Sequence, residues 1–137
     1  MAVTEYILAL DYGEKRVGVA IAHEVARMPQ PLTTLTNDDG LMSEIAKLVD
    51  AESVKTVVVG LPRSMDGGYS AQTRTAEAFA KELEQTLDVP VALADETLTS
   101  VDAEAALGPG RHPKGMVDAV AATYILERYL HEHTGEQ

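Results

Sequence analysis

Tyr6-Ile-Leu-Ala-Leu-Asp11-Tyr-Gly13 is the stretch of sequence from which we interpret the rest of the fold. Its apolar run from Tyr6 to Leu10 is short and is bounded by a glycine, which is typical of a buried central β-strand with both faces covered. Open α/β sheets usually hold ligands and metals at the carboxyl ends of such strands. Asp11 is therefore a candidate site residue, although an aspartate that only starts a turn with Gly13 explains the pattern equally well.

The composition indicates one globular domain that spans residues 1–137. A chain of 137 residues, 45% of them hydrophobic, is long enough to bury a single core. Cysteine is absent, which excludes disulfides and thiolate zinc sites and fits a reducing compartment. The sequence has neither a run of ~18 apolar residues nor the basic and apolar start of a signal peptide. We therefore expect a cytoplasmic protein without a membrane segment.

The charge balance limits how the chain could bind a polyanion. Its net charge is −11, from 22 acidic and 11 basic residues, which argues against nonspecific attraction to nucleic acid. A nucleic-acid partner would need a local basic patch, and the alternative is a solvated surface with scattered charges. The candidates for such a patch are the basic residues beside predicted loops or helix starts: Lys15, Arg16, Arg63, Arg74, Arg111 and Lys114.

Apolar patterning predicts a mixed α/β fold with five strands and helices on both faces of the sheet. Residues 16–22 follow the first strand through a tight turn and form an antiparallel hairpin with it. Residues 26–35 contain two prolines and suit an edge strand, whereas residues 55–62 and 89–94 read as buried parallel strands. Helical spacing predicts helices over residues 38–50, 70–87, 97–107 and 116–131, with loops over 63–70 and 108–115. Asn37, Asp38 and Asp39 are expected to cap the first helix.

Acidic residues recur where the predicted elements meet. Asp11 closes a central strand, Asp95 and Glu96 close another, and Asp118 lies in the first turn of the last helix, below an apolar stripe. A lone carboxylate there costs several kcal/mol unless it is paired, ligated or protonated. The alternative is that Asp118 only complements the positive end of the helix. We expect these carboxylates to meet at one edge of the sheet.

Such a carboxylate cluster predicts a divalent-metal site. Mg²⁺ and Mn²⁺ prefer oxygen ligands, and they relieve the repulsion between crowded carboxylates. Two such ions can activate a water and stabilise the leaving oxygen of a phosphodiester. The four histidines show no ligand spacing, and the sequence has no Gly-Lys-Ser/Thr phosphate loop, so no other chemistry competes well.

Four motifs in this order resemble those of the RuvX family, also called YqgF, within the RNase H-like superfamily. They are Leu10-Asp11-Tyr-Gly-Glu-Lys-Arg-Val-Gly-Val-Ala20, then Val59-Gly-Leu-Pro62 with Met65-Asp-Gly67, then Asp95-Glu-Thr-Leu-Thr-Ser100, and last Val117-Asp-Ala119 with Ala121-Ala122 and Ile125-Leu126. Each motif is weak alone. Together they cover nearly the whole chain and form a specific signal.

The resemblance implies a metal-dependent endonuclease acting on structured RNA or branched DNA, in pre-16S rRNA processing or Holliday-junction resolution. Asp11, Glu96 and Asp118 would hold Mg²⁺ or Mn²⁺ and act in catalysis, with Asp95 supporting them. Lys15, Arg16 and the loop from Gly60 to Gly67 would face the nucleic-acid backbone. Ribosomal precursor particles are possible partners under this resemblance, and the sequence leaves monomer and homodimer open.

One departure from the family pattern keeps a second interpretation open. Thr97 stands where the family commonly has an arginine, so a charge beside the metal site is missing. Together with the acidic balance, this departure favours a non-catalytic module that binds nucleic acid or assists ribosome assembly. The carboxylates argue against it, because a binder gains nothing from negative charge near phosphates. A kinase or chaperone ATPase of the same superfamily would need two such domains, and 137 residues supply one.

Overall fold

The sheet has five strands in the order β3-β2-β1-β4-β5. The computed structural model describes residues 5–62, 70–96 and 114–132. The strands are β1 (Tyr6–Tyr12), β2 (Arg16–His23), β3 (Gln30–Thr36), β4 (Val54–Pro62) and β5 (Val91–Glu96). β1 pairs antiparallel with β2 and β2 antiparallel with β3, whereas β1 with β4 and β4 with β5 are parallel. This arrangement confirms the predicted sheet, with the stretch around Leu10 in its central strand.

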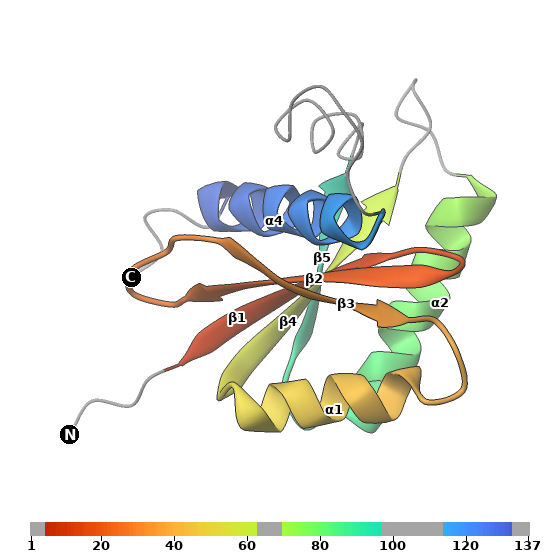
Figure 1. The fold of residues 1–137 in the computed structure, drawn as a ribbon, viewed down its shortest axis with the longest axis horizontal. Helices are drawn as coiled ribbons and strands as arrows, with labels where there is room; N and C mark the ends of the chain where they lie inside the picture. Colours follow the sequence, from red (N-terminus) through yellow and green to blue (C-terminus); the bar gives the residue numbers. More distant parts are fainter. Residues whose placement is uncertain (1–4, 63–69, 97–113, 133–137) are drawn as a thin grey trace.

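Helices cover both faces of this sheet, as predicted (Figure 1). α1 (Leu41–Ala51) and α2 (Ala71–Thr86) lie on one face, and α4 (Lys114–Glu132) crosses the other. No helix in the described residues is long and apolar enough to cross a membrane. The predicted helix over 97–107 and most of both predicted loops lie outside the described residues.

The two faces of the sheet are built from side chains of different size. Successive residues of a strand point to opposite faces, so β1 contributes alternately to two cores. The large-residue face packs against α1 and α2 and includes the buried strand residues Leu8, Leu10, Val17, Val19, Val57 and Val59 with Ile45, Phe79 and Leu83 of the helices. The small-residue face packs against α4. Most of its buried strand residues are alanines, and with Ile7 and Val58 the strands contribute Ala9, Ala20, Ala22 and Ala94, against Ala122, Ile125 and Leu126 of the helix.

Two helix starts differ from the sequence prediction. α1 begins at Leu41 with Gly40 at its N-cap, and no side chain caps it, so the capping role predicted for Asn37, Asp38 and Asp39 is wrong. The Asp38 carboxylate instead accepts a hydrogen bond from the Gly40 N–H at 2.9 Å, which makes a local turn before the helix. α4 begins at Lys114 rather than Met116, so the end of the second predicted loop is helical.

Two strands are also displaced from their predicted bounds. β3 begins only at Gln30, because the chain just before it turns, with the Arg27 N–H bonded to the His23 carbonyl at 2.8 Å. β5 runs from Val91 to Glu96 and not from Val89 to Ala94. β3 remains an edge strand, as its prolines indicated.

Candidate metal and nucleic-acid site

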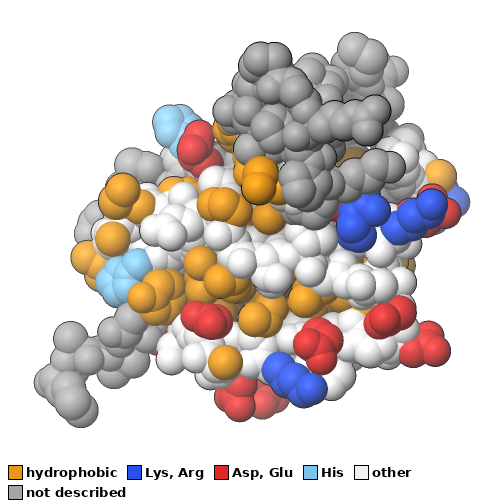
Figure 2. Space-filling view, viewed as in Figure 1, with side chains coloured by type: hydrophobic (Ala, Val, Ile, Leu, Met, Phe, Trp, Pro, Cys, Tyr) orange, Lys and Arg blue, Asp and Glu red, His pale blue; other side chains and the backbone are white. Residues whose placement is uncertain are grey.

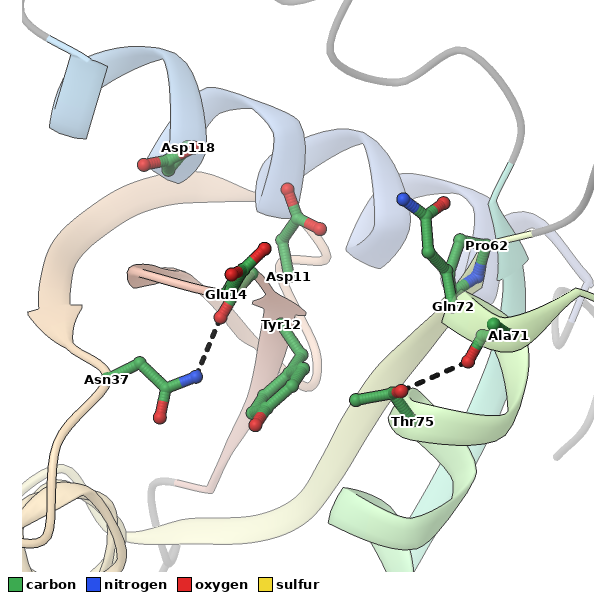
Figure 3. Close-up of a pocket in the computed structure, with 10 residues that line it drawn as sticks. Asp11, Tyr12, Glu14, Asn37, Pro62, Ala71, Gln72, Thr75 and Asp118 are labelled. Carbon is green, nitrogen blue, oxygen red and sulfur yellow. Dashed lines mark hydrogen bonds between the residues drawn. The ribbon is translucent and has the colours of Figure 1, made fainter.

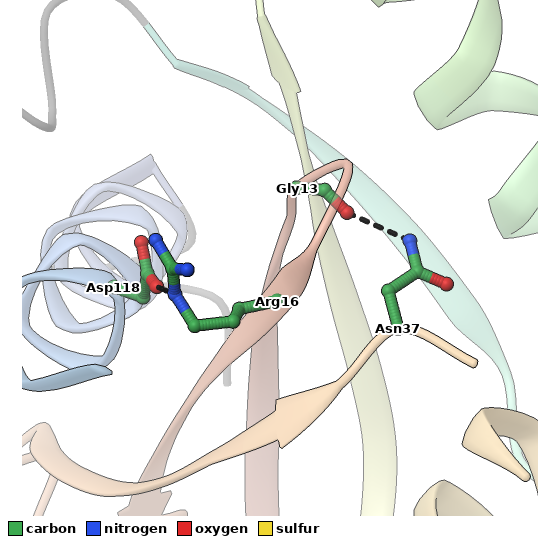
Figure 4. Close-up of polar contacts among 4 residues, drawn as sticks. All are labelled: Gly13, Arg16, Asn37 and Asp118. Carbon is green, nitrogen blue, oxygen red and sulfur yellow. Dashed lines mark hydrogen bonds and ion pairs between the residues drawn. The ribbon is translucent and has the colours of Figure 1, made fainter. Parts of the chain in front are cut away.

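The turn between β1 and β2 holds Asp11 at the carboxyl end of the central strand. A Cβ added to Gly13 would lie 2.5 Å from the Arg16 carbonyl oxygen, so this tight turn requires glycine. Asn37 fixes the turn from β3: its backbone N–H donates to the Lys15 carbonyl at 2.9 Å, and its side-chain amide donates to the Gly13 carbonyl at 2.7 Å (Figure 4). Asn37, one of the residues predicted to cap α1, therefore stabilises the turn that carries the candidate site.

Gly18 brings α4 into direct contact with the sheet. Gly18 lies opposite Asp11 in the β1–β2 register. A Cβ added to Gly18 would lie only 1.9 Å from the Asp118 carbonyl oxygen and 2.9 Å from the Ala119 nitrogen, so the helix backbone occupies the space of a side chain. The contact places Asp118 beside the end of β1. Sequence reasoning did not single out Gly18, although a glycine inside a strand is a known signal of close backbone approach.

Asp118 lies in the second turn of α4 and is paired with Arg16. The Arg16 Nε donates to the Asp118 Oδ2 at 2.6 Å, and these side chains are 37% and 25% exposed (Figure 4). Because α4 begins at Lys114 and carries no acidic residue in its first turn, the alternative that Asp118 only complements the helix N-terminus is wrong. Arg16, predicted to contact nucleic acid, thus also pairs with a predicted metal ligand.

A cavity of about 520 Å³ joins these residues to the start of α2. Carboxylates line one side of it: Asp11, Asp118 and Glu14, the last of which was not predicted. Gln72 and Thr75 of α2 lie across from them (Figure 3). Asp11 and Asp118, although 107 positions apart in the sequence numbering (118 minus 11), therefore face one space, as the sequence predicted.

The α2 side of the cavity is held by hydrogen bonds to β4. Ser70 caps α2 by accepting from the Thr73 N–H at 3.2 Å, and the Thr73 hydroxyl oxygen accepts from the Ser70 N–H at 3.1 Å, which completes a capping box. The buried Thr73 hydroxyl also donates to the Pro62 carbonyl. Because Pro62 itself lines the cavity, the end of β4 and the start of α2 form one fixed wall.

Asp95 and Glu96 end β5 next to this wall. In the β4–β5 register Asp95 pairs with Leu61 and Glu96 with Pro62, so the backbone of the third predicted metal position lies beside the cavity. The structure describes only the backbone of these two acidic residues. Among the side chains that it does describe, no group of three or more His, Cys, Asp or Glu is placed to hold a metal ion.

The predicted nucleic-acid contacts do not all lie at the cavity. Lys15 is exposed in the turn after Asp11, and Lys114 starts α4. Arg74 is exposed on α2 but lines a different groove, shared with Leu93 of β5. Arg63 lies outside the described residues, as do Arg111 and Thr97. Figure 2 shows most of the Lys and Arg side chains of this view gathered at its right, and acidic side chains spread over the rest.

Comparison with solved structures identifies the fold. The chain is similar to Thermus thermophilus RuvC in complex with a Holliday junction substrate, with a TM-score of 0.50 and 16% identity over 95% of this chain and 96% of that chain. A second T. thermophilus RuvC structure gives a TM-score of 0.51 at 13% identity. The fold is therefore RNase H-like, as predicted.

Sequence comparison then gives the family. A model of the RuvX family, described as a Holliday junction resolvase, matches residues 5–132, and the chain belongs to this family. A relative from Syntrophus aciditrophicus is 43% identical over 133 residues, covering 90% of this chain and 87% of its own length. One from Shewanella oneidensis is 38% identical over 136 residues, covering 95% and 96%. Both relatives carry the name "Putative pre-16S rRNA nuclease".

Proposed function

We propose that this protein is an endonuclease that depends on Mg²⁺ or Mn²⁺ and hydrolyses phosphodiester bonds. The observation that carries the proposal is the contact between Gly18 and the α4 backbone, which brings Asp118 to the cavity where Asp11 ends the central strand. In this proposal Asp11, Glu96 and Asp118 hold the metal and act in catalysis, and Asp95 supports them.

The described residues fit an oxygen-ligated cation. Asp11 and Asp118 supply carboxylates to one cavity, which is the donor type that hard divalent ions prefer. Arg16 bonds only one Asp118 oxygen, Oδ2, and such a partner orients a ligating carboxylate. Ala94 packs on the α4 side of the sheet, and Glu96 follows it by two positions in the strand. The two-residue period of a strand supports Glu96 as the third ligand.

The residues around the carboxylates have separate roles in the proposed hydrolysis. A bound divalent cation would activate a water for attack on phosphorus and stabilise the oxygen that leaves as the phosphodiester bond breaks. Asn37 holds the turn that carries Asp11, and Arg16 holds the Asp118 carboxylate. Lys15, exposed in that same turn, would contact a backbone phosphate.

The substrate follows from the relatives and from charge. The relatives' name favours pre-16S rRNA as the substrate, and the family description favours a Holliday junction, which is branched DNA. For the RNA substrate we propose 5′-end processing in the cytoplasm, within ribosomal precursor particles. With a net charge of −11, the protein would bind either one only through its local basic residues. Symmetric cutting of two strands would need a two-fold dimer, whereas processing of one strand would not.

Cleavage assays test this proposal against the non-catalytic module. A pre-16S rRNA 5′ fragment and a four-way DNA junction are each incubated with Mg²⁺ or Mn²⁺ and the native protein, Asp11→Asn or Asp50→Asn. We expect cleavage by the native protein, a loss of about 100-fold or more in Asp11→Asn, and no change in Asp50→Asn, an exposed carboxylate on α1. If neither substrate is cut with either metal while both are bound in a gel-shift assay, the protein is a binding module.

A further inference from the structure

We propose that the α2 side of the cavity binds one unstacked nucleoside of the substrate strand, with its base against Tyr12. This inference rests on the proposed function for the identity of the ligand, and it assigns a role to residues outside the metal site. The nucleoside would lie beside the phosphate held at Asp11 and Asp118.

The cavity is divided chemically into two parts. Asp11, Glu14 and Asp118 make one side acidic, while the rest of the lining is neutral and includes Tyr12, Asn37 and Gln72. The described residues of this neutral side offer amide, hydroxyl and aromatic groups. Amide and aromatic groups are the ones that proteins use to bind bases and sugars. The neutral side therefore fits a nucleoside.

The size of the cavity supports the same ligand. Its volume of about 520 Å³ exceeds the needs of a hydrated ion and falls within the range of roughly 300–1,000 Å³ found for small-molecule sites. The space is bounded by the β1–β2 turn on one side and by the start of α2 on the other (Figure 3). A base inside a duplex cannot enter such a space, so the nucleoside must come from an unpaired or flipped position.

Tyr12 offers a fixed aromatic surface at this place. Its ring packs on Phe79 with centroids 4.2 Å apart and an interplanar angle of 32°. Phe79 is only 5% exposed, so it anchors Tyr12 to the large-residue face while the half-buried Tyr12 still lines the cavity. An aromatic ring held in this way is a stacking platform that needs no ordering when the base arrives.

Gln72 supplies the hydrogen-bonding group of the neutral side. It is exposed in the first turn of α2, and within the described part of the chain no group is hydrogen-bonded to its side-chain amide. The capping box at Ser70 and the bond from Thr73 to Pro62 fix the helix that carries it. Gln72 therefore offers a hydrogen-bond donor and an acceptor on the α2 side of the cavity.

A neutral nucleoside tests this site without the metal. Adenosine is titrated in the absence of divalent ions, and binding is followed by the backbone amide shifts of the ¹⁵N-labelled full-length protein. We expect saturable shifts at Tyr12, Asn37 and Gln72, and a dissociation constant raised about 10-fold in Tyr12→Leu but retained in Tyr12→Phe. Gln72→Ala should weaken binding by a smaller factor.

Matched controls separate stacking from folding. Tyr6→Leu removes a half-buried tyrosine at the opposite end of β1, and Gln85→Ala removes an exposed glutamine at the far end of α2. Both should bind adenosine as the native protein does. Shifts that do not saturate, shifts that map to the groove at Leu93, or a Tyr12→Leu protein that folds and binds normally would overturn the proposal. Because no metal is present, loss of cleavage in the assays above leaves this result unaffected, and the two proposals can fail separately.

Discussion

The two faces of the sheet differ in the size of their side chains and in how closely helices pack on them. The large-residue face fills the space under α1 and α2 with leucine, valine and phenylalanine, and these side chains keep the helices away from the strand backbone. On the small-residue face alanines and Gly18 let α4 approach until backbone touches backbone. The first face is filled by large apolar side chains, whereas the second sets where Asp118 lies. The position of the candidate site thus depends on glycine and alanine, whose small size lets α4 come close to the sheet.

Adding one methyl group to the small-residue face should have the largest effect. In Gly18→Ala the new Cβ would meet the Asp118 carbonyl oxygen at 1.9 Å, and α4 must move away from β2. We expect the free energy of unfolding to fall by about 3 kcal/mol and cleavage to fall by about 100-fold. Urea denaturation and the cleavage assay measure both. Gly40→Ala is the control, because its Cβ would meet only the Asp38 carboxylate, at 3.4 Å.

Breaking the ion pair at the edge of the small-residue face should alter the site more than the fold. Arg16→Gln removes the partner of Asp118, and because the pair is partly exposed we expect the free energy of unfolding to fall by less than about 1 kcal/mol. Loss of an orienting partner should weaken Mn²⁺ binding by about 10-fold. Calorimetric titration with Mn²⁺ measures the change. Arg128→Gln, which breaks an exposed pair with Glu132 on α4, should leave Mn²⁺ binding unchanged.

Removing one methylene from the large-residue face should affect the stability of the fold more than the site. Ile45 is fully buried on α1, and Ile45→Val should lower the free energy of unfolding by about 0.5–1.5 kcal/mol. Cleavage per folded molecule should stay at the native level, because Ile45 packs on the face of the sheet opposite α4. A drop in cleavage that exceeds the loss of folded protein would show that both faces set the site.

The smallest expected effect is a pH-dependent one on stability, outside both cores. The hydrogen bond from Lys55, the largest cause, lowers the pKa of Glu24 below its ordinary 4.5. A lowered pKa in the folded state means that the pair stabilises the protein above that ordinary value, and that this contribution is lost as the pH falls through the lowered pKa. Glu24→Gln should therefore be slightly less stable than the native protein at neutral pH. Denaturation curves of the two proteins should converge in acid.

Local patterns predicted the sheet better than they predicted the joints between its elements. The central position of the strand around Leu10 followed from a continuous apolar run, and the edge position of β3 followed from Pro29 and Pro31. The N-cap of α1 was wrong because the Asn37 side chain binds a carbonyl 24 residues away, and sequence spacing does not reveal such a partner.

The candidate site shows the same division between local and distant information. The convergence of Asp11 and Asp118 on one cavity was predicted from strand and helix ends. The Arg16–Asp118 pair was not predicted, since it joins residues 102 apart and depends on how closely α4 packs. Glu14 was not predicted either, because an exposed glutamate in a turn carries no signal of its own. The assignment of Asp11, Asp95, Glu96 and Asp118 as metal ligands stays a prediction.

The distance along the chain between Arg16 and Asp118 has a consequence during protein synthesis. A ribosome makes the whole sheet before α4 leaves the exit tunnel, so the nascent chain carries Asp11 but lacks its partner from the last helix. The ribosome adds about 5–20 residues per second, and domains fold as their residues emerge. The carboxylate pair therefore forms only after every strand of the sheet has been made, and a chain that folds before α4 is available holds Asp11 without Asp118.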